Sequence, residues 1–312
     1  MGQLKRILAL AVGDPRFSQL IDHPRRSYGV RPYISGLVKG LIGRGHGLGT
    51  DFVIDYRQNW HEDIVGGTAF KESQDVALLY AMSTTVTRAA GKHTNALPIV
   101  FSNCSDHKAE QFVNEGRATG FSARRTQTAG ECFDRFFKTV PTLKQVFILH
   151  KPDYDVSDHA VELVTQSAKD RGVSPTTISV TSHSDLHEKL AKLPERAPGA
   201  VASIGVHVTP VDLLFAATPA IIKCVQETKN LPAFYPVTDW VPSGLGGYGV
   251  PQYRCGERTA EHVHQILWPE QPQRKLPEVL EAADRDFEWV VSSAAATALQ
   301  IRLPTCDGMR IV

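Results

Sequence analysis

Short apolar runs rich in Val and Ile alternate along this chain with segments that have the spacing of helices. In residues 156–172 apolar side chains recur every three or four positions, which is typical of a helix with one buried face. The runs themselves are continuously apolar, as expected of strands that helices cover on both faces. They are 6–12, 52–56, 76–82, 99–103, 145–150, 177–180, 200–205, 233–237 and 287–291. This order predicts βαβ units and an α/β fold with parallel sheets.

Two breaks in the alternation indicate two Rossmann-like lobes rather than one, in keeping with a length of 312 residues. Residues 116–125 form a Gly-bounded extended stretch, and residues 237–256 are dense in Gly and Pro and longer than an ordinary connection. We interpret both as hinge segments that cross between the lobes. The predicted lobes are 1–119 plus about 249–285, and 120–248 plus about 286–312.

Charge and hydropathy limit the classes of partner. The 34 Lys and Arg nearly balance the 33 Asp and Glu, so no overall field favours nucleic acid or an anionic membrane. No apolar stretch approaches the roughly 18 residues of a spanning helix. We interpret the start, MGQLKRILALAVGDP, as a first strand rather than a signal peptide because no small-residue cleavage site follows it. The sequence therefore predicts either that an export signal has been removed or that the protein stays in the cytoplasm.

Cysteine and histidine spacing predicts neither a metal nor another cofactor. The five cysteines are scattered without a CxxC pair. His262 and His264 lie two apart on a predicted helix and should diverge, while His183 and His187 fall in a polar helix start.

Ligands of open α/β sheets bind outside the carboxyl ends of the strands, so the residues after each strand are the candidate site. Ser83, Thr84 and Thr85 follow the run 76–82 at a predicted helix start, where unpaired N–H groups and the helix dipole favour an anion. At least one of these hydroxyls should be an N-cap. The others are candidates to donate hydrogen bonds to a carboxylate.

Other candidates in the N-terminal lobe come from two more strand ends. Ser105 and Asp106 follow the run 99–103, where either could contact a ligand or cap the next helix. Cys104 is interpreted as a packing residue because no His is placed as its base. His23, in a long loop near the first strand, is a further candidate.

The C-terminal lobe offers five candidates. Tyr154 could stack on the apolar body of a ligand. His207 should lie at the cleft edge, just before a helix start at Thr209. Asp239 is a candidate partner of a ligand ammonium and Trp240 a candidate cover for it, although either could instead pin the hinge.

The sequence resembles the ABC transporter substrate-binding proteins that include tryptophan- and phenylalanine-binding members. The resemblance spans nearly the whole chain and is carried by VALLYAMSTTVTRAA, by LPIVFSNCSDH with GRATGFS, by LPAFYP with GGYGV, and by FEWVVSSAAATALQIRLP. It implies a type I periplasmic-binding fold whose lobes close on a small ligand and deliver it to a membrane permease. It also implies that the turn at Thr84 and Thr85 is a carboxylate site.

The chain departs from the family at two positions of these motifs. Thr85 stands where a Pro is usual, and Ser292 or Ser293 where an Asn often follows the last strand. These departures leave the fold expectation intact and bear on the choice of ligand.

Three classes of function remain open from the sequence. The first is the solute-binding component of an ABC importer, a periplasmic or otherwise extracytoplasmic monomer that binds an amino acid or another small carboxylate and has no enzyme activity. The second is a cytoplasmic sensor of the same fold, although residues 1–12 leave no room for an N-terminal helix-turn-helix. The third is a racemase or hydrolase that uses Cys104, for which no opposing acid or base stands out.

Overall fold

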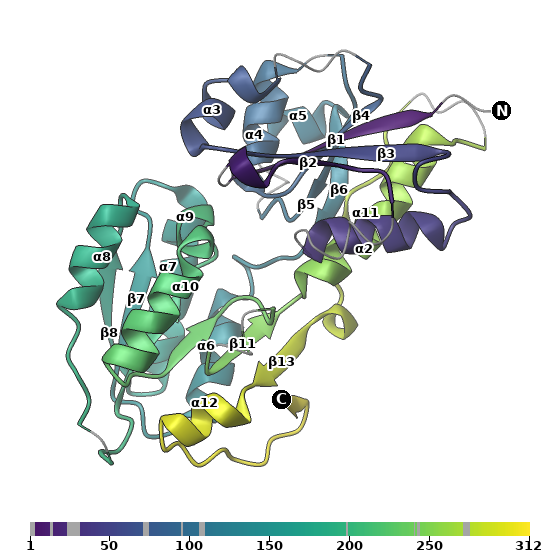
Figure 1. The fold of residues 1–312 in the computed structure, drawn as a ribbon. Helices are drawn as coiled ribbons and strands as arrows, with labels where there is room; N and C mark the ends of the chain where they lie inside the picture. Colours follow the sequence, from purple (N-terminus) through teal and green to yellow (C-terminus); the bar gives the residue numbers. More distant parts are fainter. Residues whose placement is uncertain are drawn as a thin grey trace. The chain divides into compact units, whose positions relative to one another are not determined.

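The computed structural model describes most of the chain. Contacts between residues divide it into unit 1, residues 1–124 and 252–282, and unit 2, residues 125–251 and 283–312. Among the described residues, each unit contains one sheet of seven strands. Figure 1 shows the strands with the helices beside them. The described residues are 4–12, 15–23, 32–70, 75–94, 96–105, 110–197, 199–239, 241, 244–270 and 275–312.

Unit 1 is built on a sheet with the strand order β12-β6-β5-β4-β1-β3-β2. All neighbours pair in parallel except β2, which is antiparallel to β3. In chain order its strands and α-helices are β1 (Lys5–Val12), β2 (Gln19–Ile21), α2 (Pro32–Ile42), β3 (Phe52–Asn59), α3 (His61–Val65), β4 (Leu78–Ala81), α4 (Thr84–His93), β5 (Ile99–Ser102), α5 (Gln111–Asn114), β6 (Ala118–Ser122), α11 (Gln252–Leu267) and β12 (Leu280–Glu281). Short 3₁₀ turns span Pro15–Phe17 and Thr68–Phe70.

Unit 2 repeats this plan with the strand order β14-β13-β11-β10-β9-β7-β8. Only β11 and β13 pair in antiparallel fashion. Its strands and α-helices are α6 (Ala129–Thr139), β7 (Gln145–His150), α7 (Asp155–Asp170), β8 (Ser174–Ser179), α8 (His183–Ala191), β9 (Ile204–Val208), α9 (Asp212–Ala216), α10 (Thr218–Ile222), β10 (Ala233–Tyr235), β11 (Gly246–Gly249), β13 (Glu288–Val291), α12 (Ser293–Ala298) and β14 (Met309–Ile311). A π-helical turn, Lys223–Thr228, follows α10, and a 3₁₀ turn spans Asp284–Asp286.

Helices cover both faces of each sheet, which explains why the strands are continuously apolar. In unit 2, Val146 and Ile148 of β7 pack with residues of α6 and α7, whereas Leu149 packs with residues of α8, α9 and α10 on the opposite face. In unit 1, Leu79 and Phe101 pack with residues of α3 and α4. The predicted α/β class with two mostly parallel sheets is therefore confirmed.

The helices α2 and α11 of unit 1 lie side by side (Figure 1) and meet through glycines. A Cβ atom on Gly36 of α2 would stand 1.9 Å from the carbonyl oxygen of Tyr253, and one on Gly256 of α11 would stand 2.0 Å from that of Tyr33. Only glycine permits such an approach of two backbones. This contact fixes α11, which follows residue 251 and returns the chain to unit 1.

One strand differs from the sequence prediction in a way that affects the site. The apolar run 200–205 suggested a strand there, but β9 spans Ile204–Val208 and Val201 is exposed. His207 therefore belongs to the strand itself. The prediction that it lies at the edge of a cleft beyond the strand is wrong, because its ring is fully buried and packs against the ring of Phe133.

Candidate ligand-binding site

The carboxyl edge of the unit 1 sheet carries the three consecutive hydroxyls at the start of α4. Ser83 is the N-cap of this helix, since its Oγ accepts a hydrogen bond from the N–H of Val86 at 3.3 Å. Its φ of 151° is a conformation that residues other than glycine rarely adopt. Such strain concentrates at functional sites because the surrounding structure must enforce it.

The other two hydroxyls have different environments. Thr84 is buried, and its Oγ1 accepts a hydrogen bond from the N–H of Ser105 at 3.0 Å. Thr85 is only partly buried, and its hydroxyl has no hydrogen-bond partner among the described residues. Thr85 is therefore the one of these three whose hydroxyl makes no hydrogen bond to the described residues, and it lies at the N-terminus of α4, where the helix dipole favours an anion.

The turn after β5 lies beside this helix start. Ala81 of β4 pairs with Phe101 of β5 in the sheet, so the two strands end at the same level. Ser105 is 2% exposed, and its backbone is tied to Thr84. Cys104 is fully buried, which leaves no accessible thiol for nucleophilic chemistry. Asp106, also predicted to contact the ligand, lies outside the described residues.

Asn103, in the same turn, was not selected from the sequence. It has a left-handed backbone with a φ of 67°, and its N–H donates to the carbonyl oxygen of Phe121 at 2.7 Å. The residue is 6% exposed, and no hydrogen-bond donor of the described residues reaches its buried Oδ1. A buried polar atom without a partner needs an explanation, which a bound ligand can supply.

The predicted residues of unit 2 fall in contrasting environments. Thr209 is fully buried, and its hydroxyl donates to the carbonyl oxygen of Leu149 at 2.9 Å and lies 3.2 Å from Ser157 Oγ. Tyr154 is partly buried directly before α7, with the Lys151 ammonium 5.5 Å from the centre of its ring. Thr209 thus holds the end of β9 to that of β7, while Tyr154 is only partly buried.

The remaining candidates are less informative about binding. Asp239 is partly buried in a turn of unit 2, and His23 of unit 1 is exposed two residues beyond β2. Trp240 lies outside the described residues.

His207 has an unusual environment inside unit 2. Neither ring nitrogen has a hydrogen-bond partner among the described residues, and burial lowers the pKa of His207 to about 3. The imidazole is therefore neutral at pH 7, and we do not include it in the proposed binding set.

In unit 2 the side chains of a serine, a histidine and an aspartate lie next to one another in space. This arrangement was not expected from the sequence. Ser179 Oγ lies 2.9 Å from His150 Nε2, while His150 Nδ1 is 3.7 Å from Asp158 Oδ1. Burial lowers the pKa of His150, against the opposing effect of Asp158. The distance of 3.7 Å exceeds a hydrogen bond, so the aspartate does not orient the imidazole as in a serine hydrolase.

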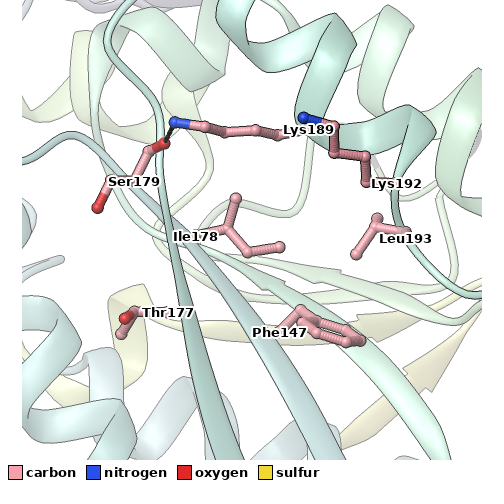
Figure 2. Close-up of a pocket in the computed structure, with 7 residues that line it drawn as sticks. All are labelled: Phe147, Thr177, Ile178, Ser179, Lys189, Lys192 and Leu193. Carbon is pink, nitrogen blue, oxygen red and sulfur yellow. Dashed lines mark hydrogen bonds between the residues drawn. The ribbon is translucent and has the colours of Figure 1, made fainter.

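A pocket of about 280 Å³ lies at the β7–β8 side of unit 2 (Figure 2). Its two lysines already have acidic partners, Lys189 with Asp185 at 2.9 Å and Lys192 with Glu188 at 2.5 Å. None of the residues predicted to bind a ligand lines it. The lining residues are Phe147, Thr177, Ile178, Ser179, Lys189, Lys192 and Leu193.

The part of the chain that the structure describes contains neither a metal-binding cluster nor a membrane-spanning helix. No group of three or more His, Cys, Asp or Glu side chains could hold a metal ion there. Among these same residues, no helix is both long enough and apolar enough to cross a membrane.

The two units together have the architecture of type I periplasmic-binding proteins, and comparison with solved structures agrees. A conserved domain protein from Vibrio cholerae matches with a TM-score of 0.75 and 18% identity over 96% of both chains. An ABC domain from Streptococcus pneumoniae in complex with L-Trp matches with a TM-score of 0.73 and 15% identity, over 99% of this chain and 100% of that one.

Sequence comparison defines the family. Residues 17–305 match the ABC transporter substrate binding protein family, and the chain belongs to this family. A tyrosine-binding protein from Clostridioides difficile is 22% identical over 305 residues, which cover 95% of this chain and 83% of that protein. The resemblance inferred from the strand-end motifs is thus confirmed.

Proposed function

We propose that this protein is the solute-binding component of an ABC importer and that its ligand is a small carboxylate, specifically an aromatic amino acid. The observation that carries the proposal is the unpartnered hydroxyl of Thr85, among the described residues, at the N-terminus of α4. A carboxylate there gains hydrogen bonds from a hydroxyl and from backbone N–H groups without needing a buried cation. The charge therefore needs no dedicated Arg or Lys.

The relatives support the choice of an aromatic amino acid. One is named a tyrosine-binding protein, and one solved neighbour holds L-Trp. In this chain the exposed part of Tyr154 offers a planar surface for such a side chain. Asp239 and Trp240 are the predicted contacts that complete the proposal, together with Ser105, Asp106 and His23.

The proposed mechanism is a shift of population from an open to a closed state when the ligand contacts both lobes. The proposal includes delivery of the ligand to a membrane permease by a monomer outside the cytoplasmic membrane, and membership of the family supports this part of it. Fractionation of cells that express the native gene tests the location. Recovery of the protein only in the cytoplasm would favour the alternative, a cytoplasmic sensor of the same fold.

A thermal-shift screen tests the binding function. The panel contains L-tyrosine, L-tryptophan, L-phenylalanine, aliphatic amino acids and small organic acids. A ligand that binds only the folded protein must raise its melting temperature, by an amount equivalent to about 2.7 kcal/mol when its concentration is a hundred times Kd. We expect the largest shifts from the aromatic amino acids. If no member of the panel raises the melting temperature, the proposal is refuted.

A further inference from the structure

The turn after β5 does not need the buried carboxamide of Asn103 to keep its conformation. Its left-handed backbone suits an asparagine, but glycine adopts the same conformation without a side chain. Among the described residues, the turn is held by hydrogen bonds of the Asn103 and Ser105 backbone N–H groups, and no hydrogen bond to the Asn103 side chain contributes. Burying an amide oxygen without a donor costs stability, so glycine at this position would give a more stable fold.

Asn103 belongs to the turn after β5, and this turn is hydrogen-bonded to the start of α4, where the carboxylate site is proposed. The paired register of β4 and β5 ends at Ala81 and Phe101, and Ser83 and Asn103 are the second residues after these two. The Ser105 N–H then reaches Thr84 in the first turn of α4. Asn103 and the first turn of α4, which contains Thr85, thus follow neighbouring strands of one sheet.

The unpaired atom is an acceptor, whereas the start of α4 and Thr85 are donors. A ligand that satisfies both must carry a hydrogen-bond donor next to its carboxylate. The α-ammonium group of an amino acid is such a donor, because it is separated from the carboxylate by a single carbon. A plain carboxylic acid would leave Oδ1 of Asn103 unsatisfied.

We infer that Asn103 accepts a hydrogen bond from the α-ammonium group of the ligand. Unit 1 then contacts both charged groups of an amino acid. This rests on the proposed function and assigns the residue that distinguishes an α-amino acid from the carboxylate lacking its amino group. It also gives the ammonium a partner in addition to the predicted Asp239. The discrimination comes from the desolvated Asn103 acceptor, which is left unpaired by the wrong ligand.

Titration calorimetry with the full chain tests this inference. The ligands are L-tyrosine and L-tryptophan, each paired with its analogue that lacks the amino group, 3-(4-hydroxyphenyl)propanoate and 3-(indol-3-yl)propanoate. The variants are Asn103→Gly, which keeps the left-handed backbone and removes the acceptor, and Asn103→Asp, which keeps both. Thr85→Val serves as the comparison at the carboxylate end.

We expect Asn103→Gly to weaken binding of the amino acids about tenfold or more, the effect of one charge-assisted hydrogen bond, and to change binding of the analogues less than about twofold. Asn103→Asp should bind the amino acids at least as tightly as the wild type. Thr85→Val should weaken an amino acid and its analogue by the same factor.

Two results would overturn the inference while leaving the proposed function intact. One is an equal loss for amino acids and analogues in Asn103→Gly. The other is binding of amino acids by Asn103→Asp that is as weak as in Asn103→Gly, because the side chain would then act as a donor through its NH₂ group. Wild-type protein that binds none of the four compounds would instead refute the inference together with an aromatic amino acid as the ligand.

Discussion

The hydroxyl oxygen of Thr84 accepts a hydrogen bond from the backbone N–H of Ser105 at 3.0 Å. This bond joins the first turn of α4 to the turn after β5, so two strand ends of unit 1 form one rigid edge. Thr84 thereby holds the geometry in which Thr85 and Asn103 are presented.

Thr84→Val should destabilise the fold, since it removes the hydroxyl that accepts the hydrogen bond from the buried Ser105 N–H. The expected loss in the free energy of unfolding is about 1–3 kcal/mol. Urea denaturation followed by circular dichroism measures it. Thr85→Val is the matched control because its hydroxyl has no partner to lose among the described residues, and it should change the stability by less than about 0.5 kcal/mol. Equal losses in the two variants would contradict the assigned roles.

Gly256→Ala should destabilise unit 1 severely. The added methyl group would stand 2.0 Å from the carbonyl oxygen of Tyr33, and a backbone atom cannot turn away as a flexible side chain can. Overpacking typically costs about 1–3 kcal/mol, and we expect a loss at or above that range because α2 and α11 must separate. Thermal unfolding measures the loss.

Gly130→Ala in α6 is the control for this helix contact. Its Cβ atom would lie 3.3 Å from the carbonyl oxygen of Leu163, a tight but tolerable distance. Its melting temperature should fall much less than that of Gly256→Ala. Similar melting temperatures for the two variants would show that the close approach of α2 and α11 is not needed for stability.

His207 should make the protein sensitive to acid. Burial lowers its pKa from the ordinary value of 6.5 to about 3 in the folded state, so the folded protein binds fewer protons than the unfolded chain between these values. Folded stability that is present above pH 6.5 is therefore lost as the pH falls toward 3, by up to several kcal/mol in the limit of full burial. Urea denaturation at a series of pH values from neutral to mildly acidic measures the slope.

His207→Leu separates this effect from general acid denaturation. It removes two buried nitrogens that have no hydrogen-bond partner among the described residues, and it keeps an apolar side chain against Phe133. We expect the variant to gain about 1 kcal/mol or more at neutral pH and to lose less stability than the wild type on acidification. A variant with the same pH slope as the wild type would contradict this account.

The sequence predicted the architecture well because strands that helices cover on both faces of a sheet consist of continuously apolar residues. Runs such as 76–82 and 145–150 contain β4 and β7, and the positions of the hydroxyls after β4 followed from them. The bounds of β9 were predicted wrongly. The apolar run 200–205 begins with exposed residues, whereas the strand starts at Ile204 and continues through His207. A shift of a few residues there moved one candidate from a strand end into the core.

The division of roles within the site could not be predicted from the sequence. Ser83, Thr84 and Thr85 have similar chemistry, and only tertiary contacts separate the cap, the cross-link to Ser105 and the hydroxyl that remains for a ligand. Asn103 ends the apolar run 99–103 and was counted with its strand. An asparagine at a strand end is a weak signal by itself, since it also marks an ordinary left-handed turn.

The measurement that most directly tests the central claim is titration calorimetry of L-tyrosine into the wild type, Thr85→Val and Thr87→Val. Thr87 lies on the same helix, but it is fully buried and its hydroxyl donates to the carbonyl oxygen of Ser83 at 2.6 Å. The account predicts saturable binding by the wild type, an affinity lower by about tenfold or more in Thr85→Val, and an unchanged affinity in Thr87→Val despite lower stability. Unaltered binding of L-tyrosine by Thr85→Val would contradict a carboxylate site at the start of α4.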